Sequence, residues 1–65
     1  MECYEANLRS YKEVSIFYEN NELYKHCVAR YEIYLVKFKL LGEIKYKNML
    51  DVLDKILQVI VSWRY

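Results

Sequence analysis

The sequence has no proline and a single glycine, Gly42, among its 65 residues. Folds that contain many strands need tight turns, and tight turns depend on glycine and proline. Their scarcity excludes an all-β fold with many turns and favours long helices. A single glycine also excludes the glycine-rich loops that hold phosphate groups.

Cysteines and long apolar runs are scarce as well. Cys3 and Cys27 are too few for a disulfide framework, and the first residues do not have the pattern of a secretory leader. Asp51, Asp54 and Lys55 interrupt the apolar C-terminal part, whereas a membrane span needs about 20 apolar residues. We therefore expect a cytoplasmic protein with free thiols and no membrane-spanning helix.

The chain has no excess of one charge either. Ten Lys and Arg residues balance nine Asp and Glu residues, which leaves a formal charge of +1. A field that attracts nucleic acid or anionic lipid can therefore only be local. Apolar residues make up 55% of the chain, which is typical of a folded protein. A domain this small has a marginal core, so we predict a single helical domain over residues 1–65 that self-associates.

Apolar and aromatic residues recur at heptad spacing between residues 14 and 38, which predicts a helix with one apolar face. One set repeats every seven residues and comprises Phe17, Tyr24, Tyr31 and Phe38, and the interleaved set comprises Val14, Asn21, Val28 and Leu35. Before Val14, the aromatic residues lie on a neighbouring face of the helix. The pair Asn20–Asn21 is compatible with a bend or break, or with an uninterrupted helix.

The residues after this stripe predict a turn and a second helix. Gly42 suits the left-handed conformation that ends a helix at Leu41, and apolar residues at three-four spacing continue from about 45 to Trp63. The resulting fold is an all-α helical hairpin. As an alternative, apolar and basic residues alternate in 36–40 and 44–47, which is typical of a short strand hairpin around Gly42 in an α+β fold.

Two hairpins of this kind are expected to dimerise into an antiparallel helical bundle. Asn21, at a core position of the heptad, would then fix the register of the helices. Trp63 adds a residue type that is enriched at interfaces. The expected dimer or partner interface comprises Phe17, Asn21, Tyr24, Val28, Tyr31, Leu35, Phe38 and Trp63.

Positive charge is uneven only around the predicted turn, where Lys37, Lys39, Lys45 and Lys47 flank Gly42. Lysines next to aromatic rings can contact phosphates and bases, so these four are candidate nucleic-acid contacts. Their ordinary role is to keep a hairpin tip soluble and to complement the helix dipole.

Catalytic and metal-binding constellations are not evident. His26 and Cys27 are adjacent, so on a helix they point about 100° apart, which does not suit a shared metal ion. Asp51 and Asp54 share a helix face and are expected to pair with Lys47 and Lys55. We predict no catalytic site, no cofactor, no metal and no small-molecule substrate.

Two segments resemble known helical families. Residues 22–31, which read ELYKHCVARY, resemble the end of the second helix in the plasmid-encoded RNA-binding repressors of primer, small hairpins that dimerise into four-helix bundles. Residues 31–57 are similar to the helix pair of tetratricopeptide-type repeats, although Lys45 stands where the repeat has a tyrosine. Both resemblances imply helices, and we carry over neither family's function.

These observations lead to two functional hypotheses. The first is a small non-enzymatic protein–protein interaction module, of the regulator or inhibitor type, that acts as a homodimer with an unidentified protein partner. The alternative is a small RNA- or DNA-binding helical dimer that uses the basic cluster around Gly42.

Overall fold

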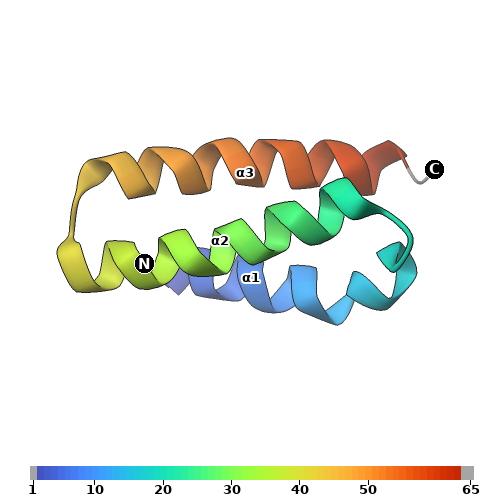
Figure 1. Cartoon of the computed structure of the whole chain (residues 1–65), viewed down its shortest axis with the longest axis horizontal. Helices are drawn as coiled ribbons and strands as arrows, with labels where there is room; N and C mark the ends of the chain where they lie inside the picture. Colours follow the sequence, from blue (N-terminus) through green and yellow to red (C-terminus); the bar gives the residue numbers. More distant parts are fainter. Residues whose placement is uncertain (1, 64–65) are drawn as a thin grey trace.

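A computed structural model of the chain describes residues 2–63, and these residues are helical apart from short connections. The helices are α1 (Glu2–Glu13), the short 3-10 helix η1 (Ser15–Tyr18), α2 (Glu22–Leu41) and α3 (Ile44–Trp63). The three α-helices lie side by side, each antiparallel to the one before it, in an elongated bundle of 35 × 19 × 17 Å (Figure 1).

The structure has three α-helices where the sequence predicted a two-helix hairpin, and the helix breaks near Asn20–Asn21, which the sequence left open. No strand occurs in the part of the chain that the structure describes, and both segments of the alternative strand hairpin are helical, so an α+β fold is not supported. A two-stranded hairpin on its own is barely stable in water. As part of α2, the first of these segments instead places Phe38 against the core.

Asn21 determines where α2 begins. Its backbone is extended, with φ −100° and ψ 97°, and its side-chain Oδ1 accepts a hydrogen bond from the backbone N–H of Tyr24 at 3.0 Å. A side-chain acceptor of this kind satisfies one of the unpaired donors at a helix start. Asn21 is thus the N-cap of α2 in this fold. The heptad had instead predicted that it fixes the register of paired helices. Because the chain turns before this cap, α1 folds back along α2.

Gly42 ends α2 at Leu41, as the sequence predicted. The glycine has φ 68° and ψ 17°, and its N–H donates to the carbonyl of Phe38 at 2.8 Å. This left-handed conformation is unfavourable for residues that have a Cβ. The turn allows α3 to begin at Ile44 and to return along α2.

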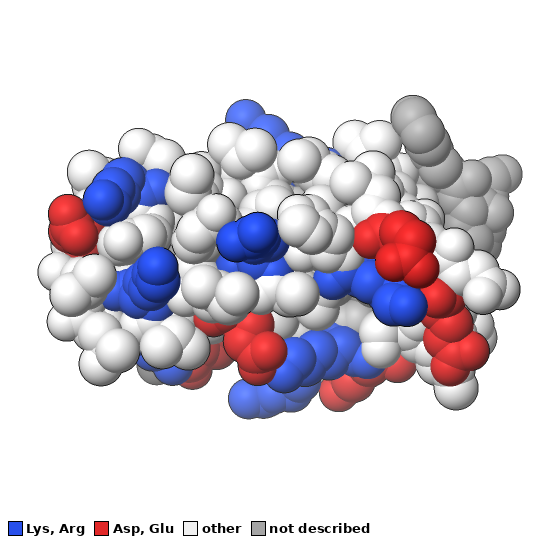
Figure 2. All heavy atoms as spheres, viewed as in Figure 1, with Lys and Arg blue, Asp and Glu red and all other residues white. Residues whose placement is uncertain are grey.

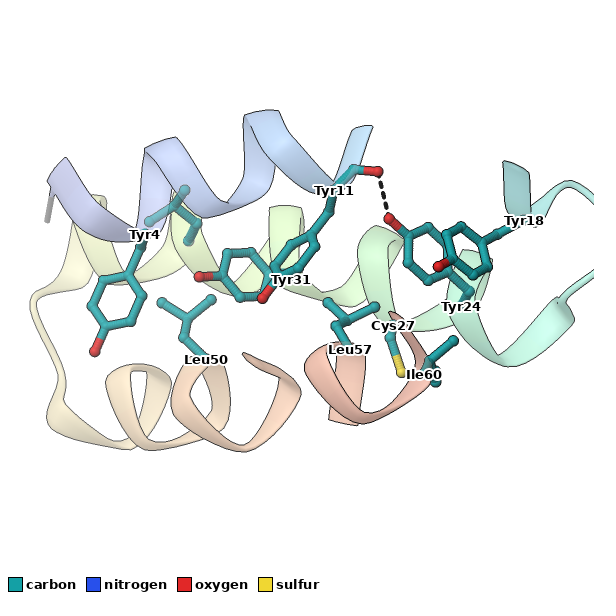
Figure 3. Packing of buried hydrophobic residues seen from close by; sticks show 10 residues of the cluster. Tyr4, Tyr11, Tyr18, Tyr24, Cys27, Tyr31, Leu50, Leu57 and Ile60 are labelled. Carbon is teal, nitrogen blue, oxygen red and sulfur yellow. Dashed lines mark hydrogen bonds between the residues drawn. The ribbon is translucent and has the colours of Figure 1, made fainter. Parts of the chain in front are cut away.

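The core lies between the three helices and is unusually rich in tyrosine (Figure 3). Tyr24 and Tyr31 of α2 and Leu50 and Leu57 of α3 are fully buried. Further buried residues are Tyr4, Tyr11, Tyr18, Cys27, Leu35 and Ile60. α1 covers much of the apolar face of α2. One chain therefore forms by itself the core that the sequence assigned to two copies.

Ring contacts connect α1 and η1 to α2. The rings of Tyr11 and Tyr31 meet edge to face with centroids 5.7 Å apart, and Tyr18 stacks on Tyr24 at 4.3 Å. Such aromatic pairs contribute about 0.5–1.5 kcal/mol beyond the burial of their area. No helix within residues 2–63 is both long and apolar enough to cross a membrane.

We expect Gly42→Ala to lower the free energy of unfolding by about 1 kcal/mol, because alanine is strained at a positive φ. Apart from its two neighbours in the chain, no atom of residues 2–63 lies within 4 Å of an added Cβ, so the backbone conformation causes the loss. Urea unfolding followed by far-UV circular dichroism measures it. Gly42→Asn is the control, and it should lose less stability because asparagine tolerates this conformation better.

Candidate functional site

The densest group of polar side chains lies around Asp54 of α3. Its carboxylate accepts hydrogen bonds from the Tyr11 hydroxyl at 2.8 Å, the Tyr31 hydroxyl at 3.1 Å and the Asn7 amide at 3.3 Å. These donors come from α1 and α2, so the carboxylate joins all three helices. A buried hydroxyl needs such an acceptor, since an unsatisfied one costs about 1–3 kcal/mol.

A second carboxylate, Asp51, lies one turn earlier on α3. It accepts a hydrogen bond from the Tyr4 hydroxyl at 2.6 Å and pairs with Lys47 at 3.4 Å. The hydrogen bond from Tyr4 and the charge of Lys47 lower the pKa of Asp51. The predicted pairing of Asp51 with Lys47 is confirmed, whereas Asp54 contacts phenol groups where the sequence suggested a lysine.

Burial raises the pKa values of three core tyrosines, Tyr11, Tyr24 and Tyr31. It raises the pKa of Tyr24 from 10.0 to about 12, and it also raises the pKa values of Tyr11 and Tyr31, with the nearby Asp54 adding to both shifts. These phenols therefore stay protonated at neutral pH and act as hydrogen-bond donors. Together with Asp54, the phenols of Tyr11 and Tyr31 hold the three helices to one another through hydrogen bonds.

The two cysteines and the single histidine differ in burial. Cys27 is buried, and burial raises the pKa of its thiol, while Cys3 and His26 are exposed. Within residues 2–63, no three His, Cys, Asp or Glu side chains are grouped so that they could hold a metal ion.

A groove of about 510 Å³ lies between α2 and α3, and in the described part of the chain its lining comes from these two helices. Its lining comprises His26, Arg30, Tyr34, Met49, Val52 and Leu53. Met49 is 46% exposed and Val52 is 55% exposed, so apolar surface of both reaches solvent. The groove has the size of many ligand sites and is mostly apolar.

The apolar surface continues along α3 beyond the groove. Helical spacing places Val59 two turns after Val52 on the same face, and Val59 is 46% exposed. Between Met49 and Val59 the helix rises about 15 Å. An apolar strip of this length matches about three turns of a second helix.

Basic and aromatic side chains lie at the end of the groove nearest the Gly42 turn. Tyr34 of α2 stacks on Tyr46 of α3 with centroids 6.2 Å apart. The ammonium groups of Lys37 and Lys45 lie 5.9 and 5.1 Å from the centroid of the Tyr46 ring, in cation–π geometry. Figure 2 shows this face as mostly uncharged, with basic groups along it and acidic groups at its ends and lower edge.

Two basic groups of the groove and its basic end have no acidic partner within residues 2–63. Arg30 and Lys37 take part in none of the ion pairs found there, whereas Lys45 forms a long ion pair of 4.0 Å with Glu43. No acidic residue of the described part of the chain lines the groove. Its local charge is therefore positive although the whole chain is nearly neutral.

The four lysines that the sequence grouped as nucleic-acid contacts have different partners in the structure. Lys37 and Lys45 lie over Tyr46, whereas Lys39 forms an ion pair with Glu5 of α1 and Lys47 with Asp51. Lys45 also lies 4.0 Å from Glu43, so three of the four lysines have an acidic partner within the chain.

The residues predicted at a dimer or partner interface are also divided. Tyr24, Tyr31 and Leu35 are buried by the helices of the same chain, and Val28 and Phe38 are partly buried against that core. Phe17 is 62% exposed on η1. Trp63 ends α3, and its side chain lies outside the described residues.

Sequence reasoning missed the groove itself, whose lining includes Arg30, Tyr34 and Met49. The available signal was the wide apolar face of the last helix, to which Val52 and Val59 add. A face wider than one neighbouring helix can cover leaves apolar surface exposed.

Comparisons with known proteins found no match: no family, no curated protein and no solved structure resembles the chain at a significant level.

We expect Asp54→Ala to lower the free energy of unfolding by about 2–3 kcal/mol, because it leaves the Tyr11 and Tyr31 hydroxyls without their acceptor. Urea unfolding measures this loss. Asp51→Ala is the control on the same helix, and it should lose less, since it removes the acceptor of one phenol at a more accessible position. Equal losses for the two variants would show that Asp54 has no special role.

The raised tyrosine pKa values predict unfolding at alkaline pH. A phenol whose pKa is higher in the folded than in the unfolded state stabilises the fold fully below the unfolded value and loses this effect as pH rises. For Tyr24 the window lies between 10.0 and about 12. Tyrosine ionisation, followed by ultraviolet absorbance, should therefore coincide with loss of the helical circular dichroism signal. Ionisation of all tyrosines near pH 10 without loss of helix contradicts the prediction.

Proposed function

We propose that the chain is a non-enzymatic protein–protein interaction module whose groove between α2 and α3 receives an acidic amphipathic helix of a partner protein. The observation that supports this most is the combination, along one face, of an exposed apolar strip with Arg30 and Lys37, which form no ion pair within residues 2–63. Helices that dock into grooves use apolar anchors at every third or fourth residue. Met49, Val52 and Val59 supply matching apolar contacts.

The shape of the groove favours a partner that inserts a helix over a partner with a flat surface. The groove between Arg30 and Tyr34 on one side and Met49 and Val52 on the other has a volume of about 510 Å³, which accommodates the anchor side chains of a helix. Burial of such anchors supplies about 25 cal/mol per Å² of apolar area removed from water. Tyr and Arg are also enriched among residues that dominate binding energy.

Charge favours an acidic partner over a second copy of the same face. If two copies met through this groove, Arg30, Lys37 and Lys45 of one would approach the same groups of the other, and juxtaposed like charges disfavour association. Carboxylates on the flanks of a partner helix would instead pair with these groups. Nucleic acid is less favoured, because Lys39 and Lys47 have acidic partners within the chain.

A designed peptide tests the proposal directly. The probe is an amphipathic helical peptide of about 15 residues with leucine anchors and flanking glutamates, which spans about 22 Å as a helix. We expect it to bind more tightly than the same peptide with lysine in place of glutamate, as measured by fluorescence anisotropy. Val52→Asp should weaken binding by about tenfold or more, since it places a charge of the peptide's own sign in the groove.

A matched control is available on another face. Val36 is 50% exposed, close to the 55% of Val52, but it lines the cleft between α1 and α2. Val36→Asp should therefore leave the affinity within about twofold. Equal weakening by both substitutions, or equal binding of the acidic and basic peptides, contradicts the proposal.

The charge contribution is tested separately. The double substitution Arg30→Gln and Lys37→Gln should weaken binding of the acidic peptide and reduce its dependence on salt, because fewer exposed ion pairs are screened. A single-stranded RNA oligonucleotide serves as the competing probe. If the RNA binds more tightly than the acidic peptide and Val52→Asp does not change this, the nucleic-acid alternative replaces the proposal.

A further inference from the structure

α1 is attached to the other two helices through directional polar contacts. Tyr11 donates to Asp54 of α3, and Lys12 pairs with Glu32 of α2 at 2.5 Å. These directional contacts specify one position of α1, and beneath it lies Tyr31, which is fully buried. If α1 left this surface, an identical α1 would be the segment best able to replace it.

The connection that lets α1 fold back is short and contains no residue that prevents a helix. Residues 2–41 have neither proline nor glycine. Glu19 already has right-handed helical angles, with φ −56° and ψ −33°, whereas Asn21 is extended. A change of backbone angles in a few residues, centred on Asn21, would therefore join η1 and α2 into one continuous helix.

The sequence is also suited to that continuous helix. The heptad repeat runs without interruption from Val14 through Asn21 to Val28 and beyond, although the helix itself is interrupted at Asn21. In a continuous helix these residues would share one face. The folded-back form also has an unfavourable feature, since the buried Tyr18 hydroxyl in η1 has no hydrogen-bond partner within residues 2–63.

We propose that two copies of the chain exchange α1. The connection around Asn21 straightens, and α1 of each copy packs on α2 and α3 of the other copy with the contacts that it makes within one chain. Because the exchange preserves these contacts, the balance between the two forms depends on the connection and on protein concentration. Among residues 2–63, α2 and α3 line the groove and α1 does not, so this inference is independent of the proposed function.

Cross-linking of isotope-mixed protein tests the exchange. Chains with normal and with heavy nitrogen are unfolded together, refolded and separated into monomer and dimer by size. A water-soluble carbodiimide then joins Lys12 to Glu32, whose charged groups are 2.5 Å apart. In the dimer fraction, about half of these cross-linked peptides should contain one normal and one heavy chain when they are analysed by mass spectrometry. Random pairing of exchanged subunits requires this proportion. The monomer fraction should contain none.

Two substitutions should shift the equilibrium in opposite directions. Glu22→Pro places proline at the first residue of α2, where a helix tolerates it, but where it would break a helix that continues through Asn21. It should abolish the dimer. Asn21→Ala removes the cap of α2 and introduces a strong helix former, so it should raise the dimer association constant by about fivefold or more.

Glu22→Gln controls for the loss of charge at this position and should dimerise as the unaltered chain does. Analytical ultracentrifugation of all four proteins measures these changes. The proposal fails if the chain is monomeric at every concentration, or if the dimer contains Lys12–Glu32 cross-links only within single chains. If the Glu22→Pro variant is a monomer and still binds the acidic peptide, the groove functions without the exchange. The two proposals can therefore fail separately.

Discussion

The carboxylate of Asp54 is the point on which the arrangement of the three helices depends. It accepts hydrogen bonds from Asn7 and Tyr11 of α1 and from Tyr31 of α2. Apolar contacts alone would allow α1 to slide or rotate on its neighbours, because burial of apolar area has no direction. Hydrogen bonds to one carboxylate do have direction, so they determine where α1 lies.

Much of the secondary structure could be predicted from the sequence because its signals are local. Gly42 ends α2 through its own backbone conformation, and three-four spacing located α3. The start of α2 at Asn21 could not be predicted as clearly. The heptad continues through this residue, so both a break and a continuous helix fit the same sequence. That ambiguity has a physical basis in a connection that contains neither proline nor glycine.

The packing of α1 and the groove could not be predicted in the same way, because both depend on contacts between residues far apart in the chain. The hydrogen bond from Tyr4 to Asp51 joins positions 47 residues apart. The sequence indicated excess apolar surface and assigned it to a second copy. In the structure, α1 covers one face of the α2–α3 pair, and the exposed remainder lies on another face, beside Arg30 and Lys37.

The tyrosine-rich core also constrains how such a sequence can evolve. A leucine in a core can be exchanged for another apolar residue with modest repacking, but the hydroxyl of Tyr31 must keep an acceptor, and the carboxylate of Asp54 must keep its donors. Changes at one of these positions therefore favour compensating changes at the other. Homologous sequences that share this fold should vary at positions 11, 31 and 54 as a set, whereas the apolar positions 50 and 57 should drift independently.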